Sequence, residues 1–295
     1  MRVFVTGASG FVGSAVVQEL LGAGHHVYGL ARSDASAQAL LAAGAAVHRG
    51  SLDDLDSLRN GAAAADGVIH LAFNHDFSAY ETAGETDRLA IEAMGGVLAG
   101  SARPLLVTGG LAGFNLGRPA TEEDTPMPLA RMSGPAAAAL AAQGVHASVV
   151  RLASSVHDRG DHGFVPTLIN IARQTGVAAY VGDGLNRWPA VHRRDAARLY
   201  RLALEKGAIG AVYHGAADEG IPMRAIAAVI GRHLNLPVVS KTPEEATSHF
   251  GWMARFVGLD MPATSILTQQ RLNWHPIHPG LLADLEDGDY FEVGK

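Results

Sequence analysis

The sequence predicts an α/β fold: a doubly wound parallel sheet followed by a smaller C-terminal lobe. Short apolar runs alternate with helical segments as far as residue 152, which implies right-handed crossovers covering both faces of a parallel sheet. A glycine-rich turn joins the first apolar run to the first helical segment. Beyond residue 152, glycine and proline interrupt the pattern. We therefore divide the chain into residues 1–152, which build the sheet, and residues 153–295, a lobe interleaved with it.

The first element carries the most specific pattern. Residues 3–5 form a β-branched and aromatic run that is typical of a buried parallel strand. Three glycines spaced three apart follow, and they lead into an amphipathic stretch that ends at Gly22. The first glycine permits a tight bend, the second lets backbone approach a pyrophosphate, and the third lets the helix pack closely. The pattern predicts a dinucleotide cradle formed by Gly7, Ser9, Gly10, Phe11, Val12 and Gly13.

The remaining elements of the first half follow in order. Hydrophobic patterning predicts further strands at 26–31, 46–49, 67–72, 105–108 and 145–152. Helices are predicted from a cap at Ser33 or Asp34 to Gly44, over about 78–98, and over 133–142. The last two are rich in alanine and glycine, so their faces allow close approach of a second copy and predict a two-fold homodimer.

Composition excludes several classes of function. A chain of 295 residues can bury a sizeable core, and a net charge of −6 without a basic block argues against nucleic acid as a partner. There is no cysteine, so disulfides and thiolate metal sites are absent. Met1 runs directly into the first strand and no apolar run reaches membrane-spanning length. We expect a cytoplasmic protein with a small-molecule substrate and no membrane partner.

Short motifs recur from one end of the chain to the other. They are TGASGFVG at 6–13, HLA at 70–72, VTGG at 107–110, EEDTP at 122–126, VRL at 150–152, VGDGLNRWPAVHRRDAA at 181–197 and RLNWHP at 271–276. Together they resemble the extended short-chain dehydrogenase/reductase family, also called the NAD-dependent epimerase/dehydratase family. The resemblance implies a Rossmann fold, with NAD(P) bound across the carboxyl ends of the strands and substrate held beneath the C-terminal lobe.

One motif of that family is missing. Its chemistry rests on a Tyr-x-x-x-Lys pair before the sixth strand and on a serine or threonine after the fifth. Aligned on Ser133, the chain has Ala130 in place of the tyrosine and Gly134 in place of the lysine. No tyrosine lies between residues 80 and 180 and no lysine precedes residue 206, so a shifted alignment does not restore the pair. Thr108 is the hydroxyl left near the serine position, and the chain is identified as an atypical member of the family.

The residues after the second strand predict the cofactor. An NAD-preferring site carries an acidic residue there for the ribose hydroxyls, but this chain has Ala31, followed by Arg32 and Ser33. A guanidinium at this position suits the 2′-phosphate of NADP, although an ordinary exposed arginine is the alternative. The resemblance also assigns to the cofactor Ser51 and Leu52, near the adenine, and the strand ends Leu71, Ala72, Arg151 and Leu152.

Candidate residues for chemistry and substrate follow later strands. His75, next to a carboxylate, could supply a proton near neutral pH, and His162 and a water bound to Thr108 are the other candidate donors. For His75, a loop histidine that caps backbone groups is the alternative. The residues expected to contact substrate are Asn74, His157, Phe164 and Trp188, with core packing as the alternative for the two aromatic ones. The mixed His and Asp spacing of residues 157–162 resembles a metal site, but these dinucleotide enzymes need no metal, so none is expected.

These observations predict an NADP(H)-dependent reductase acting on a carbonyl or imine of a small apolar molecule. A protein without tyrosine and lysine must protonate its product otherwise, or take a substrate that is already cationic, such as an iminium. The first alternative is a non-catalytic NADP(H) sensor that keeps the fold and discards the chemistry. The second is a nucleotide-sugar epimerase or dehydratase, against which the missing pair counts because oxidation of a sugar hydroxyl needs a base.

Overall fold

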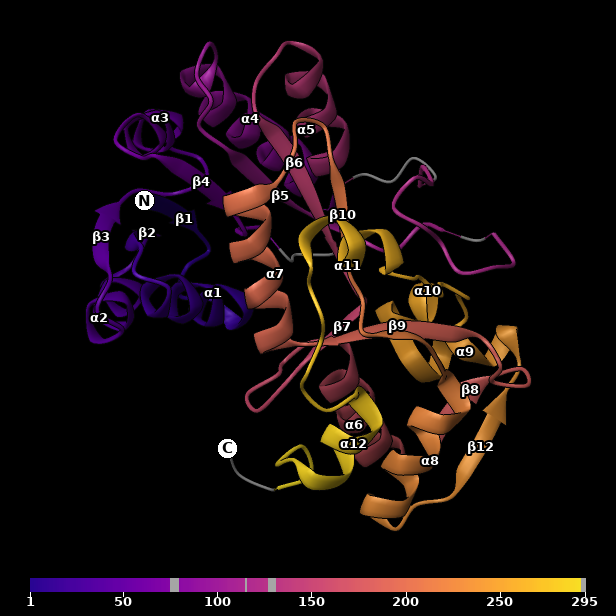
Figure 1. Cartoon of the computed structure of the whole chain (residues 1–295). Helices are drawn as coiled ribbons and strands as arrows, with labels where there is room; N and C mark the ends of the chain where they lie inside the picture. The colour runs from indigo at the N-terminus through magenta and orange to yellow at the C-terminus, as the bar shows by residue number, and fades with distance from the viewer. Residues whose placement is uncertain (75–79, 115, 127–130, 293–295) are drawn as a thin grey trace.

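The structure is a computed structural model that describes residues 1–74, 80–114, 116–126 and 131–292. Its central sheet consists of β1 (Arg2–Thr6), β2 (His26–Ala31), β3 (Ala46–Arg49), β4 (Gly67–His70), β5 (Leu105–Gly110), β6 (Ala147–Leu152) and β10 (Val212–Gly215). These strands are parallel, in the order β10-β6-β5-β4-β1-β2-β3 (Figure 1). The strand order reverses between β1 and β4. The predicted doubly wound sheet is confirmed, and its switch point lies beside the glycine-rich turn.

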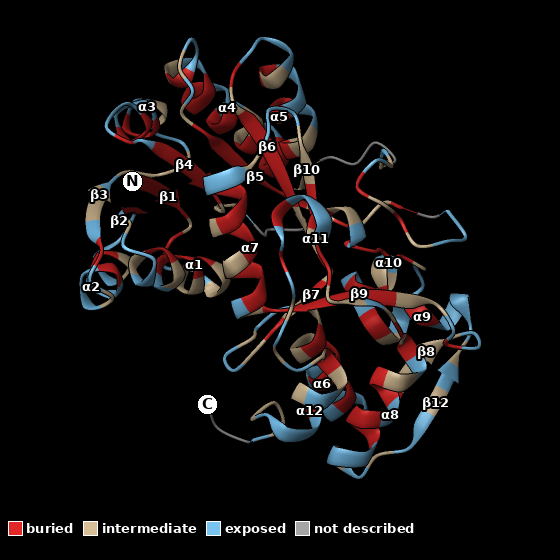
Figure 2. Ribbon diagram, viewed as in Figure 1, coloured by how far each residue is buried: buried red, intermediate tan, exposed pale blue. Residues whose placement is uncertain are grey.

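Helices cover both faces of this sheet. They are α1 (Phe11–Gly22), α2 (Asp34–Ala42), α3 (Leu55–Ala63), α4 (Tyr80–Leu98), α5 (Ser133–Ala142) and α7 (Arg193–Lys206). In β1, Val3 and Val5 belong to the core shared with α1, α2 and α7, whereas Phe4 belongs to the core shared with α3, α4 and α5. This alternation follows from the two-residue period of a strand. In Figure 2 the central strands are buried along most of their length, while β3 at the sheet edge is half-buried or exposed.

The C-terminal lobe adds two small sheets, below and to the right of the central sheet in Figure 1. One contains β7 (Ser155–His157), β9 (Arg187–His192) and β11 (Asp218–Pro222), and the other β8 (Ala178–Val181) and β12 (Val238–Lys241). Its helices are α6 (Phe164–Thr175), α8 (Met223–Leu234), α9 (Pro243–Phe250), α10 (Ala254–Val257), α11 (Ile266–Leu272) and α12 (Leu281–Asp287). A single turn of 3₁₀ helix, η2 (Gly251–Met253), lies between α9 and α10.

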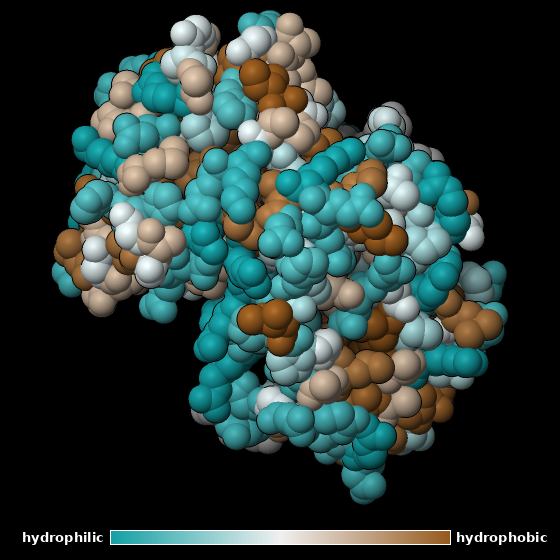
Figure 3. Space-filling view, viewed as in Figure 1, coloured by the Kyte–Doolittle hydropathy of each residue, from teal (hydrophilic) through white to brown (hydrophobic). Residues whose placement is uncertain are grey.

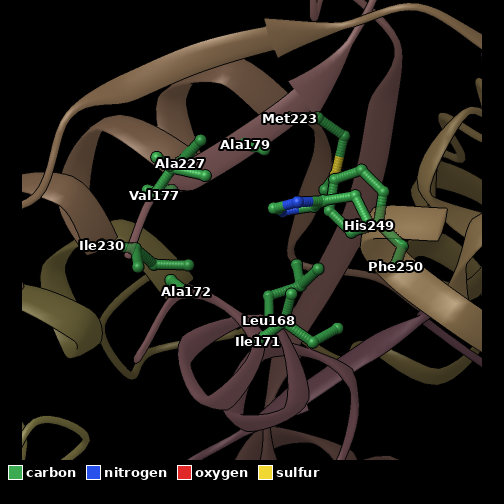
Figure 4. Close-up of a pocket in the computed structure, with 11 residues that line it drawn as sticks. Leu168, Ile171, Ala172, Val177, Ala179, Met223, Ala227, Ile230, His249 and Phe250 are labelled. Carbon is green, nitrogen blue, oxygen red and sulfur yellow. The ribbon is translucent and has the colours of Figure 1, made fainter. Parts of the chain in front are cut away.

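The lobe has its own apolar core, which contains a small cavity. A cavity of about 10 Å³ lies among Leu168, Met223, His249 and their neighbours (Figure 4). That volume suits about one water molecule and no substrate. On the molecular face of Figure 3, hydrophilic side chains cover most of the surface and apolar ones form small separate groups.

Sequence patterning predicted most elements of the first half. The strands at 26–31 and 46–49 and the helix at 133–142 have the predicted bounds, whereas β4 ends at His70 and β5 extends to Gly110. Helix α3 and strand β10 were not predicted, because α3 is short and charged and β10 comes from far along the chain. None of the helices in the described parts of the chain is long and apolar enough to cross a membrane.

The small residues of α4 and α5 pack against each other within the chain. A Cβ placed at Gly95 would lie 2.4 Å from Leu140 Cδ1, so glycine permits this close approach. Ala90 and Ala136 are buried in the same core cluster. Part of the small-residue surface that predicted a homodimer is therefore used inside one copy, and the dimer stays a prediction.

Two glycines offer a matched test of this packing. A Cβ at Gly61 on α3 would lie 2.4 Å from the ring of buried Phe4, whereas a Cβ at Gly96 on α4 would meet nothing within 4 Å. Gly61→Ala should lower the free energy of unfolding by about 1–3 kcal/mol through overpacking. Gly96→Ala should raise it by about 0.5–1 kcal/mol, because alanine favours a helix. Chemical denaturation measures both, and a Gly61→Ala protein as stable as the unmutated one would contradict the rigid contact with Phe4.

Candidate functional site

The turn after β1 has room only for glycine at two positions. A Cβ at Gly7, whose φ is +67°, would lie 2.7 Å from Ala72 N and 3.0 Å from Leu71 C. A Cβ at Gly13 would lie 2.0 Å from Gly7 O, inside any contact distance. The amide of Gly10 closes the turn by donating to Gly7 O at 3.0 Å. The close fit holds the first helix and the end of β4 against the turn, as the glycine pattern predicted.

The N-terminus of helix α1 has no side-chain cap. Gly10 is its N-cap residue and provides no side-chain cap, so the first N–H groups of the helix are left without a side-chain acceptor. Ser9 and Gly10 are exposed, and Phe11 and Val12 are half-buried. An anion at this position would receive those N–H groups and the positive end of the helix dipole. The residues present therefore fit the diphosphate of a dinucleotide.

Two side chains border this helix start. The ring of exposed His162 lies edge-on to Phe11 at 5.7 Å between centroids, and the guanidinium of Arg193 lies 4.7 Å above the same ring. Arg193 is also ion-paired with Asp158 at 3.1 Å. His162 was predicted as a proton donor, but the structure places it beside the diphosphate cradle. Arg193 escaped notice in the sequence because it lies 182 positions from Phe11 along the chain.

The carboxyl end of β2 holds the residues predicted for the 2′-phosphate. Arg32 is exposed directly after the strand. Ser33 is the N-cap of α2, and its hydroxyl oxygen accepts from Ser36 N at 3.2 Å. Ser33 therefore starts the helix, while the Arg32 guanidinium remains at the surface beside the edge.

A second arginine lies at the same edge. Arg49 ends β3 and pairs in register with Ala31, so parallel pairing brings it next to the residues that follow β2. Its guanidinium donates to Asp34 at 2.6 Å on the surface. The half-buried Ser51 and Leu52 follow it. Sequence reasoning missed Arg49, although the convergence of adjacent parallel strand ends was a signal that could have found it.

A chain of hydrogen bonds lies under the switch point. Thr6 Oγ1 accepts from Ala72 N at 3.2 Å and lies 2.8 Å from His70 Nδ1. Because a carboxylate only accepts, the Nε2–H of His70 donates to Asp87 Oδ1 at 3.1 Å, and Ser133 Oγ donates to Asp87 Oδ2 at 2.5 Å. Thr6, His70, Asp87 and Ser133 are all buried. The chain joins the ends of β1 and β4 to α4 and α5.

Thr108 takes a different role from the one predicted. Its hydroxyl donates to His70 O at 2.7 Å and lies 2.8 Å from Tyr200 OH, and only 6% of the residue is exposed. Burial raises the pKa of Tyr200. With its O–H given to His70 O and Tyr200 OH beside it, the Thr108 hydroxyl links β5 to β4 and α7, and its near-complete burial favours this structural role.

The side chains predicted to contact substrate separate into two groups. Trp188 is completely buried in the core of the C-terminal lobe, which is the alternative weighed for it. His157 is also completely buried, with Nδ1 at 2.8 Å from Asp284 Oδ2. These two therefore support the lobe instead of facing a ligand. Asn74 is exposed after β4, and His75, the next residue, lies outside the described residues.

Phe164 keeps an exposed part and belongs to an aromatic group. Its ring lies 5.5 Å from Trp188, 6.0 Å from Trp252 and 5.1 Å from Phe256 between centroids. Trp252 is 42% exposed, so this group reaches the surface of the lobe. It forms an apolar wall with Trp188 behind it.

Arg151 is occupied by protein groups. Its NH1 donates to Asp124 O at 2.9 Å and lies 3.3 Å from His214 Nε2, and its guanidinium lies 5.2 Å above the Phe114 ring. These contacts hold the loop before α5 against β6 and β10, so the predicted cofactor role has no support from this side chain. The next residue, Leu152, is half-buried and packs against the core. Within the described ranges, no group of three or more His, Asp or Glu side chains is placed to hold a metal ion.

A parallel sheet with a glycine cradle at its switch point defines a dinucleotide-binding protein of the Rossmann type. The NAD dependent epimerase/dehydratase family model matches residues 3–94. Schizosaccharomyces pombe "Uncharacterized protein C2A9.02" is 51% identical, over 99% of this chain and 100% of that protein. A Stigmatella aurantiaca protein, "4-hydroxy-2-methyl-3-oxo-4-farnesyl-3,4-dihydroquinoline-1-oxide ketoreductase", is 30% identical, over 72% of this chain and 67% of that protein.

The solved structures agree on the fold. DesIV, a dTDP-glucose 4,6-dehydratase from Streptomyces venezuelae with NAD and TYD bound, superposes with a TM-score of 0.77 at 19% identity, over 97% of this chain and 96% of that chain. The chain belongs to the NAD dependent epimerase/dehydratase family. Membership implies a nicotinamide cofactor, and the cradle described above fits one.

The burial of His214 beside Arg151 predicts that the stability of the folded protein depends on pH. Burial, with a smaller contribution from Arg151, lowers the pKa of His214 to about 4, and Glu122 opposes the shift. The unfolded chain takes up this proton near pH 6.5, so the folded state loses stability as the pH falls from about 6.5 to about 4. This group should contribute a loss of roughly 2–3 kcal/mol over that window.

Urea unfolding at a series of pH values measures this loss. His214→Gln should be less stable than the unmutated protein at pH 7, because two buried contacts change, but its stability should fall less steeply toward pH 4. The exposed His275→Gln serves as the control and should leave the slope unchanged. Parallel pH profiles for the His214→Gln and unmutated proteins would contradict the assignment.

Proposed function

We propose that the chain is an NADP(H)-dependent reductase of a carbonyl or imine on a small apolar molecule. The observation that carries this proposal is that the polar side chains near the ends of β4 and β5 are already hydrogen-bonded within the protein. His70, Asp87 and Thr108 are buried and hydrogen-bonded to one another or to other protein groups. An epimerase or dehydratase that oxidises a sugar hydroxyl needs a base there. Reduction of a carbonyl needs a proton donor instead of a base, and solvent water can supply that proton, so the arrangement favours reduction.

The surface at the ends of β2 and β3 supports NADP over NAD. Arg32 and Arg49 supply two guanidinium groups at this edge, and Ala31 stands where an acidic residue would bind ribose hydroxyls. Arginine forms paired hydrogen bonds with phosphate, which an unphosphorylated ribose does not offer. Asp34 already holds Arg49 at the edge, so its side chain is partly positioned before the cofactor arrives.

The aromatic wall of the C-terminal lobe supports an apolar substrate. Phe164, Trp252 and Phe256 present ring surface that would bury apolar groups of a ligand. The Stigmatella aurantiaca relative is named as a ketoreductase, which is the same reaction class.

A second candidate function is an NADP(H) sensor. The same buried and hydrogen-bonded polar groups that argue against a base offer no proton donor either, and burial raises the pKa of the nearby Tyr80 phenol. A sensor would bind the cofactor and change no substrate. Affinity and turnover must therefore be measured separately.

The affinity prediction tests the cofactor. NADPH should bind more tightly than NADH by about 1.5–3 kcal/mol, the range for hydrogen bonds to a charged group. Arg32→Ala and Arg49→Ala should each remove part of this preference, and the double variant most of it. Arg59→Ala, an exposed arginine on α3, is the matched control and should keep the preference. Isothermal titration gives the affinities of all five proteins for both cofactors, and equal binding of NADPH and NADH by the unmutated protein would contradict the proposal.

The turnover prediction tests the reaction. The unmutated protein should consume NADPH with at least one member of a panel of aryl ketones and their matched imines, followed by the loss of nicotinamide absorbance. Product analysis should show the corresponding alcohol or amine in equal amount. Tight NADPH binding without turnover of any member would replace the reductase with the sensor.

A further inference from the structure

Arg131 is a fixed side chain at the ends of the two central strands. Its Nε donates to Ser133 Oγ at 3.0 Å and its NH2 donates to Thr108 O at 2.9 Å. The guanidinium lies 4.3 Å from the centroid of the Phe73 ring. These anchors come from the start of α5, the end of β5 and the segment after β4. A side chain held from three directions is positioned before any ligand binds.

The guanidinium keeps hydrogen-bonding capacity and charge. Nε and NH2 of Arg131 have hydrogen-bond partners. Among the described residues, NH1 has no hydrogen-bond partner, and no carboxylate forms an ion pair with the guanidinium. The nearby buried carboxylate is Asp87, which meets Ser133 instead and has its other oxygen bound by His70. Asp87 is 1% exposed, whereas Arg131 is half-buried. A ligand that approaches from solvent therefore meets the cation before the carboxylate.

We propose that Arg131 binds the carbonyl oxygen of the substrate and stabilises the negative charge that forms on it. The proposal rests on the reductase function, because it assumes the cofactor's diphosphate at α1. The turn that would hold the diphosphate lies at the switch point beside β4, and Arg131 is anchored at the neighbouring end of β5, where ligands of such sheets bind. Sequence position alone gave no reason to single out Arg131, since the contacts to Thr108 and Phe73 are long-range.

The chemistry balances without an acidic side chain. The cofactor, when bound, supplies the two electrons and the hydrogen that reach the carbonyl carbon. The electron pair of the C=O π bond then moves to the oxygen, whose charge Arg131 meets with an N–H donor. Arginine remains protonated in this role, so the proton that completes the alcohol comes from solvent water, which leaves hydroxide to the buffer.

This assignment selects between the two substrate classes. A fixed guanidinium attracts a carbonyl oxygen and repels a cation placed at the same point. An iminium substrate would bring its positive charge to Arg131 in a partly desolvated site. The structure therefore assigns neutral ketones or aldehydes to this site in preference to iminium cations.

A binding experiment tests the charge without turnover. Benzoate and benzylammonium are similar in size and opposite in charge, and both are titrated into NADP⁺-loaded protein by calorimetry. The unmutated protein should bind benzoate at least tenfold more tightly. Arg131→Met should lose this preference, Arg131→Lys should keep part of it, and Arg59→Met, the matched surface control, should keep all of it. Equal or tighter binding of benzylammonium by the unmutated protein, or an unchanged preference in Arg131→Met, would overturn the proposal.

Turnover separates this proposal from the reductase function. Arg131→Met should reduce kcat on the best ketone by about 10²–10³, the usual effect of removing a donor to a developing oxyanion. NADPH affinity should change little, and kcat/KM of the unmutated protein should stay level from pH 6 to pH 9, because no side chain donates the proton. Full ketone activity in Arg131→Met would overturn the role of Arg131 and leave the reductase standing. Absence of any turnover by the unmutated protein would overturn both.

Discussion

The buried carboxylate of Asp87 is the constraint on which the centre of the molecule depends. A carboxylate taken out of water is costly unless each oxygen receives a hydrogen bond. Here His70 donates to one oxygen and Ser133 to the other. Each donor is oriented in turn, His70 by Thr6 and Ser133 by Arg131. All donors therefore point toward one acceptor, and two strand ends and two helices are fixed in a single arrangement.

The glycine cradle and this polar chain share one residue pair. Ala72 N donates to Thr6 Oγ1, and the same backbone nitrogen would be 2.7 Å from a Cβ at Gly7. The position of Ala72 thus depends on the Asp87 chain, and the position of the turn depends on Ala72. A change that unpaired Asp87 would loosen the diphosphate site from below, although no member of the chain touches a phosphate.

Local pattern was sufficient for the fold and for the cradle. The period of two in β1 and the spacing of Gly7, Gly10 and Gly13 are properties of neighbouring residues, so the sequence displays them directly. The residues that were missed depend on distant pairings, such as Arg49 beside Ala31 through strand register. Thr108 and Trp188 show the opposite problem. Their side-chain chemistry suggested a functional site. However, Thr108 is buried against Tyr200 and Trp188 is buried in the core of the lobe, so both have structural roles. No local sequence pattern specifies this burial.

The predicted absence of the family's tyrosine and lysine agrees with the same chain of hydrogen bonds. Ser133 occupies the matched position of the family motif, but here its hydroxyl serves Asp87 and orders Arg131. A titrating acid beside a buried carboxylate would have its pKa raised by burial and by the like charge, which favours its neutral form and makes it a weaker proton donor at neutral pH. An arginine avoids this difficulty, because it stays charged in such surroundings and acts by position alone. The buried Asp87 chain and the Arg131 guanidinium at the strand ends are therefore compatible with each other, and the reduction that we propose for this site would take its proton from water.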